Sequence, residues 1–160
     1  MSQTISTEPL TADAFAPFGD VLELRDAPDV MINQGLCGRH HDLATMGFGG
    51  GRAGISLFDA QPRRLPYTLD MVERHPLGSQ AFVPMHAAPF LVIVAPDVDQ
   101  GPGTPRAFLT KPGQGINFHQ GTWHGVLTPL SAPGLFAVID RIGDGDNLEE
   151  HWFSKPWVVK

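Results

Sequence analysis

The sequence is poor in three features that mark particular classes of protein. It has a single cysteine, Cys37, which excludes an intrachain disulfide and fits a reducing compartment. It has no cluster of Lys and Arg, and its net charge of −6 argues against nucleic acid, whose binding depends on basic patches. It has neither a signal-peptide pattern at its start nor any segment near the roughly 20 apolar residues of a membrane span. We therefore expect a cytoplasmic protein that binds neither nucleic acid nor a membrane.

The composition is that of an ordinary folded domain. Hydrophobic residues make up 42% of the 160 residues and charged residues 18%. A domain of this size buries roughly two-thirds of its unfolded surface, so it needs no disulfide or structural metal to fold. No internal repeat or linker interrupts the chain. We expect one domain, residues 1–160.

Turn-forming residues are abundant and evenly spread. Gly (18) and Pro (15) form about a fifth of the chain, against about one-eighth in average proteins. Between them lie short segments rich in Val, Ile, Leu, Phe and Thr, which are typical of strands. These segments are Val30–Asn33, Gly54–Phe58, Tyr67–His75, Gln80–Met85, Phe90–Ala95, Arg106–Thr110, Gly115–His119, Thr122–Leu127 and Leu135–Arg141. Eight or nine strands at intervals of roughly 8 to 15 residues predict an all-β barrel or sandwich.

Helix signals are few. Residues 11–16 predict one short N-terminal helix, with Thr11 as its cap and Pro17 and Gly19 ending it. The type of Leu148–Lys160 is left open. Phe90–Ala95 is apolar without alternation, which predicts a strand covered on both faces, by the barrel interior and by a second sheet or a subunit. A homodimer is our expectation.

Two short stretches carry the polar residues that predict a site. Glu73 and His75 are two residues apart, so a strand presents both on one face. Pro76–Ser79 favours a tight turn, and a return strand from Gln80 would place the Gln80 amide near His75. In the second stretch, Gly121 allows a turn after His119, which lets His124 begin a new strand pointing inward.

The set Glu73, His75, Gln80 and His124 predicts a ligand or metal site inside the barrel. Carboxylate and imidazole suit first-row divalent metals, and convergent polar groups in an apolar barrel are costly without a purpose. An amide is a weaker ligand than a carboxylate, so we expect loose metal binding. Four other histidines are better interpreted as structural residues: His40, His41, His86 and His151.

At these residues the sequence resembles the cupin superfamily. His75 matches the second His of the first cupin motif, while Glu73 replaces the first His and Gln80 replaces the Glu. In the second motif, Pro-x-Gly-x-x-His, His119 replaces the Pro and His124 matches the metal-binding His. These departures weaken the match to cupins with a tightly bound redox metal.

The same departures resemble the ureidoglycolate lyase family. The resemblance covers nearly the whole chain and runs through Phe15–Asp20, Ile32–Gly35, Arg39–Leu43, Glu73–Met85, Arg106–Leu109, Gly115–His119, Thr122–His124 and Ile139–Arg141. It implies a cupin-type double-stranded β-helix, or jelly-roll barrel, that forms a homodimer. It also implies cleavage of (S)-ureidoglycolate to glyoxylate and urea in allantoin breakdown. The ligand candidates themselves are compatible with a divalent ion, nickel or another first-row metal, that is weakly bound or absent.

Roles for single residues follow as hypotheses. His75, Gln80, His124 and Glu73 are the metal-ligand candidates. If Glu73 is not fully committed to the metal, it accepts the hydroxyl proton of the substrate, and His119 donates a proton to the departing urea nitrogen. Substrate-binding candidates are Arg39 and Arg106, whose guanidinium groups pair bidentately with carboxylates, and Asn117.

Other functions stay open at this level. The chief alternative of another class is a non-catalytic cupin that binds a small organic acid, as a sensor does. An amidohydrolase acting on ureidoglycolate would release ammonia instead of urea. Isomerases and dioxygenases of the generic cupin type are disfavoured, because the first His and the Glu of the usual motif are replaced.

Overall fold

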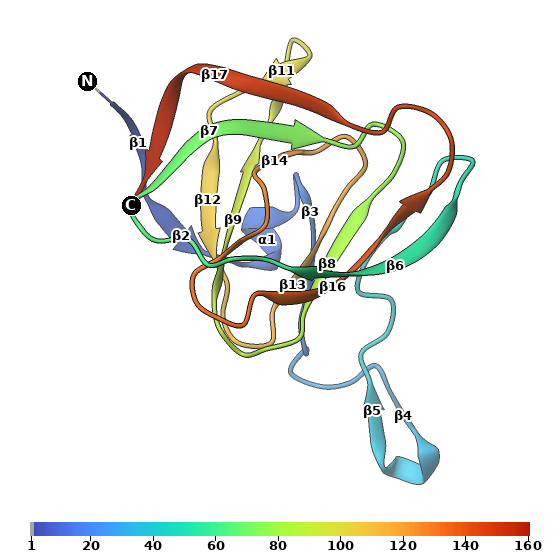
Figure 1. Cartoon of the computed structure of the whole chain (residues 1–160). Helices are drawn as coiled ribbons and strands as arrows, with labels where there is room; N and C mark the ends of the chain where they lie inside the picture. Colours follow the sequence, from blue (N-terminus) through green and yellow to red (C-terminus); the bar gives the residue numbers. More distant parts are fainter. Residues whose placement is uncertain (1) are drawn as a thin grey trace.

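The computed structural model describes residues 2–160, and nearly all of its regular structure is β-strand (Figure 1). An eight-stranded sheet, called the first sheet here, has the order β1-β17-β7-β14-β9-β12-β2, with β15 also paired to β9. Its strands are β1 (Gln3–Ile5), β17 (Glu149–Val159), β7 (Tyr67–Arg74), β14 (Trp123–His124), β9 (Phe90–Ala95), β12 (Arg106–Leu109), β2 (Thr7–Pro9) and β15 (Thr128–Pro129).

The second sheet has five strands in the order β3-β13-β8-β16-β6. They are β3 (Gly19–Leu22), β13 (Gly115–Phe118), β8 (Gln80–Pro84), β16 (Leu135–Ile142) and β6 (Arg52–Asp59). The two sheets form a nearly closed barrel of the cupin type, as expected from the sequence (Figure 1). Smaller elements are the pairs β4 (Val30–Ile32) with β5 (Cys37–Arg39) and β10 (Asp97–Val98) with β11 (Gly101–Pro102), the helix α1 (Ala12–Phe15) and the 3₁₀ turn η1 (Asn33–Gly35).

The predicted helix cap is confirmed. The Thr11 side chain accepts a hydrogen bond from the Ala14 backbone N–H over 3.2 Å, which satisfies one of the free donors at the start of α1. The helix ends at Phe15, whose ring is buried in the core. No helix within residues 2–160 is long and apolar enough to cross a membrane.

Strand β9 is buried along its whole length, as its unbroken apolar sequence predicts. Phe90, Val92 and Val94 join the core cluster that holds residues of the second sheet. The alternate residues face a second cluster, where they meet side chains of β7 and β17 such as Leu69 and Val159. The chain therefore covers both faces of β9 itself.

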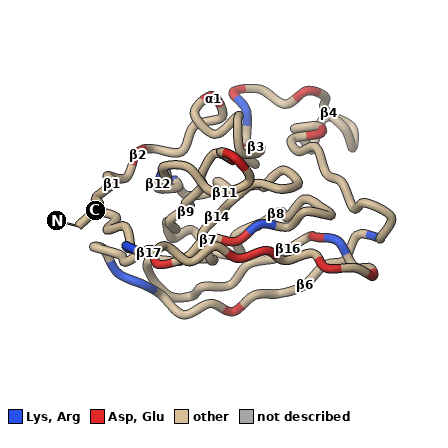
Figure 2. The backbone as a smooth tube through the Cα atoms, turned by 90° about the horizontal axis from the view of Figure 1, so that it is seen from above, with Lys and Arg blue, Asp and Glu red and all other residues tan. Residues whose placement is uncertain are grey.

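The C-terminal segment, whose type the sequence left open, is the long strand β17. It pairs with β7 over most of its length, and the register shifts between Trp152 and Trp157, where Pro156 interrupts the ladder. This pairing brings the C-terminus beside β1 (Figure 1). Acidic and basic residues are interspersed along the chain, and no basic stretch stands out among the residues drawn (Figure 2).

Candidate active site

Three of the predicted ligands converge in the structure. Glu73 lies near the end of β7, His75 follows that strand, and His124 lies on β14 directly opposite Glu73. Each offers one ligand atom, and these atoms lie within 4.8 Å of one another. The rings of His75 and His124 are 5.2 Å apart between centroids. The expected turn at Gly121, with its φ of 79°, delivers His124 to this position.

A backbone carbonyl orients each imidazole ring through its Nδ1 and leaves its Nε2 available to a ligand. His75 Nδ1 donates to the Asn147 carbonyl over 2.8 Å, and His124 Nδ1 donates to the Gly125 carbonyl over 2.9 Å. A carbonyl only accepts, so Nδ1 carries the hydrogen in each ring, and in the neutral form of each ring Nε2 keeps its lone pair. Both Nε2 atoms are buried and have no hydrogen-bond partner among residues 2–160. A buried lone pair without a partner is costly, and a cation between the rings would satisfy both.

The predicted hairpin between the strands of His75 and Gln80 is wrong. Strand β7 pairs with β17 and β14, whereas β8 pairs with β13 and β16 in the second sheet. Residues 76–79 therefore connect the first sheet to the second. Pro and Gly occur in such connections as well as in tight turns, so their presence does not distinguish the two.

Gln80 nevertheless faces the barrel interior. It is paired with Phe118 on β13, and the Phe118 ring stacks on that of His124 with centroids 4.2 Å apart. Directly paired residues share one face of a sheet, so the amide lies on the same side as His124. Gln80 is buried, and its Oε1 has no hydrogen-bond partner in the part of the chain that the structure describes.

These groups fit a divalent cation of the first transition row. Two imidazole nitrogens, a carboxylate and an amide oxygen are hard or borderline ligands, and three of their atoms are buried without a partner. Burial raises the pKa of the Glu73 carboxyl, and the Glu150 charge adds to this, while the charge of His75 lowers it. A positive ion beside Glu73 would favour its ionised form.

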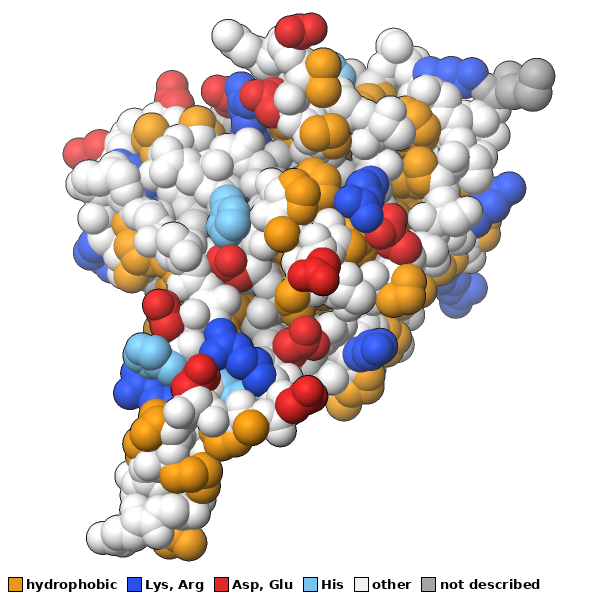
Figure 3. Space-filling model, turned by 180° about the vertical axis from the view of Figure 1, so that it is seen from behind, with side chains coloured by type: hydrophobic (Ala, Val, Ile, Leu, Met, Phe, Trp, Pro, Cys, Tyr) orange, Lys and Arg blue, Asp and Glu red, His pale blue; other side chains and the backbone are white. Residues whose placement is uncertain are grey.

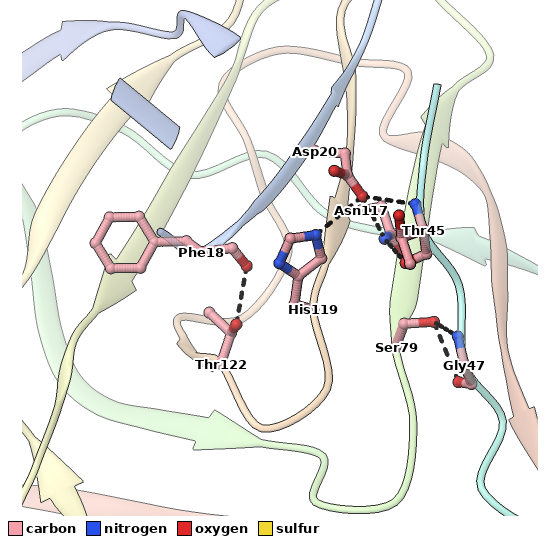
Figure 4. A network of polar contacts seen from close by, with 8 residues as sticks. All are labelled: Phe18, Asp20, Thr45, Gly47, Ser79, Asn117, His119 and Thr122. Carbon is pink, nitrogen blue, oxygen red and sulfur yellow. Dashed lines mark hydrogen bonds and ion pairs between the residues drawn. The ribbon is translucent and has the colours of Figure 1, made fainter. Parts of the chain in front are cut away.

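His119 lies outside the group of Glu73, His75 and His124 and belongs to a polar network around Asp20 (Figure 4). Phe118 points to the interior, so its neighbour Asn117 points outward, as does the Asp20 side chain paired with it. Asp20 Oδ2 accepts hydrogen bonds from His119 Nε2 (3.0 Å), Asn117 Nδ2 (3.0 Å) and the Thr45 backbone N–H (2.9 Å).

Asp20 thus fixes the tautomer of His119. Because the carboxylate accepts from Nε2, Nδ1 is left toward Phe18 and Thr122 (Figure 4). Both of these residues line an open cleft of about 400 Å³ together with Arg74 and His119. A second cleft of about 330 Å³ borders the other side of the ring and is lined by Thr45 and Ser79 among others.

The other substrate-binding candidates are spread over the molecule. Asn117 is fully buried and belongs to the Asp20 network, where its Oδ1 has no hydrogen-bond partner among the described residues. Arg106 pairs with Glu8 and also donates to the Ala14 carbonyl over 3.2 Å. Arg39 lies on β5, in the hairpin that projects from the body of the molecule (Figure 1). The structure therefore does not bring the two arginines to the convergent group.

Comparison with known protein families and sequences gives one answer. The family model described as Ureidoglycolate lyase matches residues 2–160. The chain belongs to the ureidoglycolate lyase family. It is 60% identical to the protein named Ureidoglycolate lyase of Rhodobacter capsulatus, over 99% of both chains. It is 55% identical to the protein of that name from Chelativorans sp., over 97% of this chain and 95% of the other. It is also 55% identical to Ureidoglycolate lyase 2 of Rhizobium meliloti, over 95% of this chain and 94% of the other.

The sequence alone does not reveal three residues that orient the candidate side chains of the site through hydrogen bonds. They are Asp20 for His119, Asn147 for His75 and Asp140, which accepts a hydrogen bond from Gln80. Each lies at least 60 residues from its partner in the chain, so no local spacing reveals the contact. The pairing of strands brings Asp20 and Asp140 to their partners, and the loop before β17 brings Asn147 to His75.

Acid should destabilise the metal-free protein through His124. Burial lowers the pKa of His124 to about 3, and the charge of His75 adds to the effect. In the unfolded chain the group titrates at its ordinary value of 6.5, so between pH 6.5 and about 3 the unfolded state binds a proton that the folded state does not. We expect a loss of about 2 kcal/mol in unfolding free energy from pH 7.5 to pH 5 through this residue.

Urea unfolding at the two pH values, after chelation, measures this loss. The His124→Gln variant cannot take up the proton and should lose about 2 kcal/mol less than the wild type over the same interval. Equal losses in the two proteins would show that His124 accepts a proton in the folded state.

Proposed function

We propose that the chain is a ureidoglycolate lyase that cleaves (S)-ureidoglycolate to glyoxylate and urea during allantoin breakdown in purine degradation. The observation that carries the proposal is the 60% identity to a protein of this name over 99% of both chains. The convergent Glu73, His75 and His124 support it, because two imidazoles and a carboxylate are groups that can hold a metal ion and accept a proton. We place the enzyme in the cytoplasm, as one domain acting on a small-molecule substrate.

We further propose that Glu73, His75, Gln80 and His124 hold a divalent ion, nickel or another first-row metal. The three buried ligand atoms without partners support this proposal. When bound, such an ion supplies Lewis acidity to the carboxylate and hydroxyl of the substrate. The amide of Gln80 is a weak ligand, so the affinity should be lower than in sites with a second carboxylate.

Glu73 is the base in this proposal. As the C–N bond breaks, the substrate hydroxyl loses a proton and its carbon becomes a carbonyl, while the urea nitrogen gains a proton. The partly buried carboxylate of Glu73 binds a proton more readily than an exposed one, because burial raises its pKa. It can therefore receive the hydroxyl proton beside the two imidazoles.

His119 remains our proposed acid toward the urea nitrogen. In this role the His119 ring is an imidazolium, with Nε2–H held by Asp20 and Nδ1–H as the donated proton, and the ureido end of the substrate reaches the cleft that His119 lines. We expect His119→Ala to lower kcat by about 100-fold and to change KM little, since a general acid acts in the transition state. Steady-state kinetics on glyoxylate release measures both constants. Unchanged turnover would remove His119 from the mechanism.

The test of the function is a product assay on purified protein. Incubation with (S)-ureidoglycolate should release glyoxylate and urea in equal amounts. Release of ammonia in place of urea would make the enzyme an amidohydrolase, and binding without any product would make the protein a non-catalytic binder of organic acids. The assay is repeated after chelation, with divalent metals added back singly. Full activity without metal would overturn the metal site and leave the function intact.

We also propose a homodimer. The outer face of the second sheet exposes large apolar side chains on paired strands, among them Ile55 and Leu57 on β6, which are 76% and 64% exposed. The projecting β4–β5 hairpin carries further exposed apolar residues such as Leu36 (Figure 3). Exposed apolar surfaces of this kind mark association sites.

A charge on the sheet face should break the dimer. We expect Leu57→Glu to convert the protein to monomers, because a carboxylate would be buried without a partner in the interface. Leu24→Glu is the matched control, since Leu24 is 80% exposed on a separate loop. Sedimentation equilibrium measures both variants. A dimer that persists with Leu57→Glu would exclude this face from the interface.

A further inference from the structure

The amide of Gln80 is oriented by a carboxylate on the neighbouring strand. Asp140 on β16 is directly paired with Gln80 on β8, and Gln80 Nε2 donates to Asp140 Oδ2 over 3.1 Å. An ionised carboxylate only accepts hydrogen bonds, so the nitrogen of the amide must face Asp140. The amide oxygen is therefore turned away from Asp140, and it is the atom that is buried without a partner.

The same arrangement recurs at His75 and His124. In each of the three side chains, one N–H group donates a hydrogen bond to an acceptor. The other polar atom, Nε2 of each histidine and Oε1 of Gln80, is buried without a partner within residues 2–160. The acceptors of the two histidines are backbone carbonyls, which the protein supplies whatever the side chain. Asp140 alone among the three acceptors is a side chain. It does not itself belong to the convergent group of Glu73, His75 and His124.

We propose that Asp140 is a positioning residue that holds the Gln80 oxygen toward the metal ligands. The inference rests on the proposed metal site. It adds a physical reason why the ligand at position 80 is an amide and not a carboxylate. A carboxylate at that position would face Asp140 at hydrogen-bonding distance, and two like charges so close disfavour each other. With Asp140 opposite, the amide is the group that both bonds the neighbour and leaves an oxygen free.

A double-mutant cycle on positions 80 and 140 tests the proposal, with Ni²⁺ as the probe. In the wild-type background, Asp140→Asn offers both a donor and an acceptor, so the Gln80 amide loses its preferred orientation. We expect the Kd for Ni²⁺ to rise by about 10-fold. In the Gln80→Glu background the same Asp140→Asn change removes the repulsion and supplies a donor to the new carboxylate. There we expect the Kd to fall by about 10-fold.

The reversal of sign is the expected signature, because a merely structural effect of Asp140 would act in the same direction in both backgrounds. Isothermal titration calorimetry gives each Kd, and thermal melts confirm that each variant is folded. Asp59→Asn is the matched control: Asp59 is an exposed carboxylate on β6 of the same sheet, and its variant should bind Ni²⁺ like the wild type.

The outcomes separate this inference from the function on which it rests. Equal or absent effects of Asp140→Asn in the two backgrounds would overturn the positioning role while leaving the metal site and the lyase activity intact. A wild type that cleaves ureidoglycolate yet binds no Ni²⁺ would overturn the metal site and the inference together. A wild type that binds Ni²⁺ and shows the reversal but forms no glyoxylate would overturn the function alone.

Discussion

His124→Gln should abolish measurable Ni²⁺ binding and lower kcat/KM for ureidoglycolate by about 1,000-fold, the scale of losing a Lewis acid worth several kcal/mol. His124 is 2% exposed, and its Nε2 is one of two imidazole lone pairs that converge beside Glu73. Gln at this position cannot present the same nitrogen lone pair. Calorimetry with Ni²⁺ and the glyoxylate assay measure the two losses.

The control for this prediction is another histidine. His41 is exposed near the base of the β4–β5 hairpin, and its backbone N–H donates to Asp29, whereas its ring has no hydrogen bond within residues 2–160. His41→Gln should therefore bind Ni²⁺ and turn over like the wild type. Metal binding retained in His124→Gln would place the ion elsewhere. A loss of activity without a loss of metal would instead assign His124 to the substrate.

The sequence allowed the pieces of this site to be identified because their spacing has a local physical meaning. The two-residue interval between Glu73 and His75 predicts a shared strand face, and both side chains do contribute to the convergent group. Gly121 predicts the turn that aims His124 inward, and its positive φ is a conformation that suits glycine. The unbroken apolar run of β9 predicts a strand buried on both faces, as found.

What spacing did not reveal is which strands become neighbours. The turn residues between His75 and Gln80 fit a hairpin as well as a crossing between sheets, and local chemistry does not distinguish the two. Likewise His119 and His124 share one short motif, yet His119 follows β13 of the second sheet and bonds to Asp20, whereas His124 lies on β14 of the first sheet, opposite Glu73. The bond from His119 to Asp20 spans 99 residues and depends on the pairing of β13 with β3.

Glu73→Gln should separate the two roles assigned to this residue. The amide keeps an oxygen that can ligate a metal but cannot accept a proton at neutral pH, so we expect kcat to fall by about 1,000-fold, within the range for a lost general base. The Kd for Ni²⁺ should rise far less, by about 10-fold, because His75, His124 and Gln80 remain as ligands. Rapid-mixing measurement of glyoxylate release and calorimetry give the two numbers.

Glu150→Gln is the matched control, since Glu150 is paired with Glu73 across β17 and β7 but is exposed. Its variant should keep near-normal turnover, because its carboxylate reaches Glu73 only through its charge. If Glu73→Gln loses metal and activity in equal proportion, Glu73 is a ligand and some other group accepts the hydroxyl proton. If turnover falls while metal binding persists, the proton passes to Glu73, and the departures from the usual cupin motif are what free a carboxylate for acid–base work.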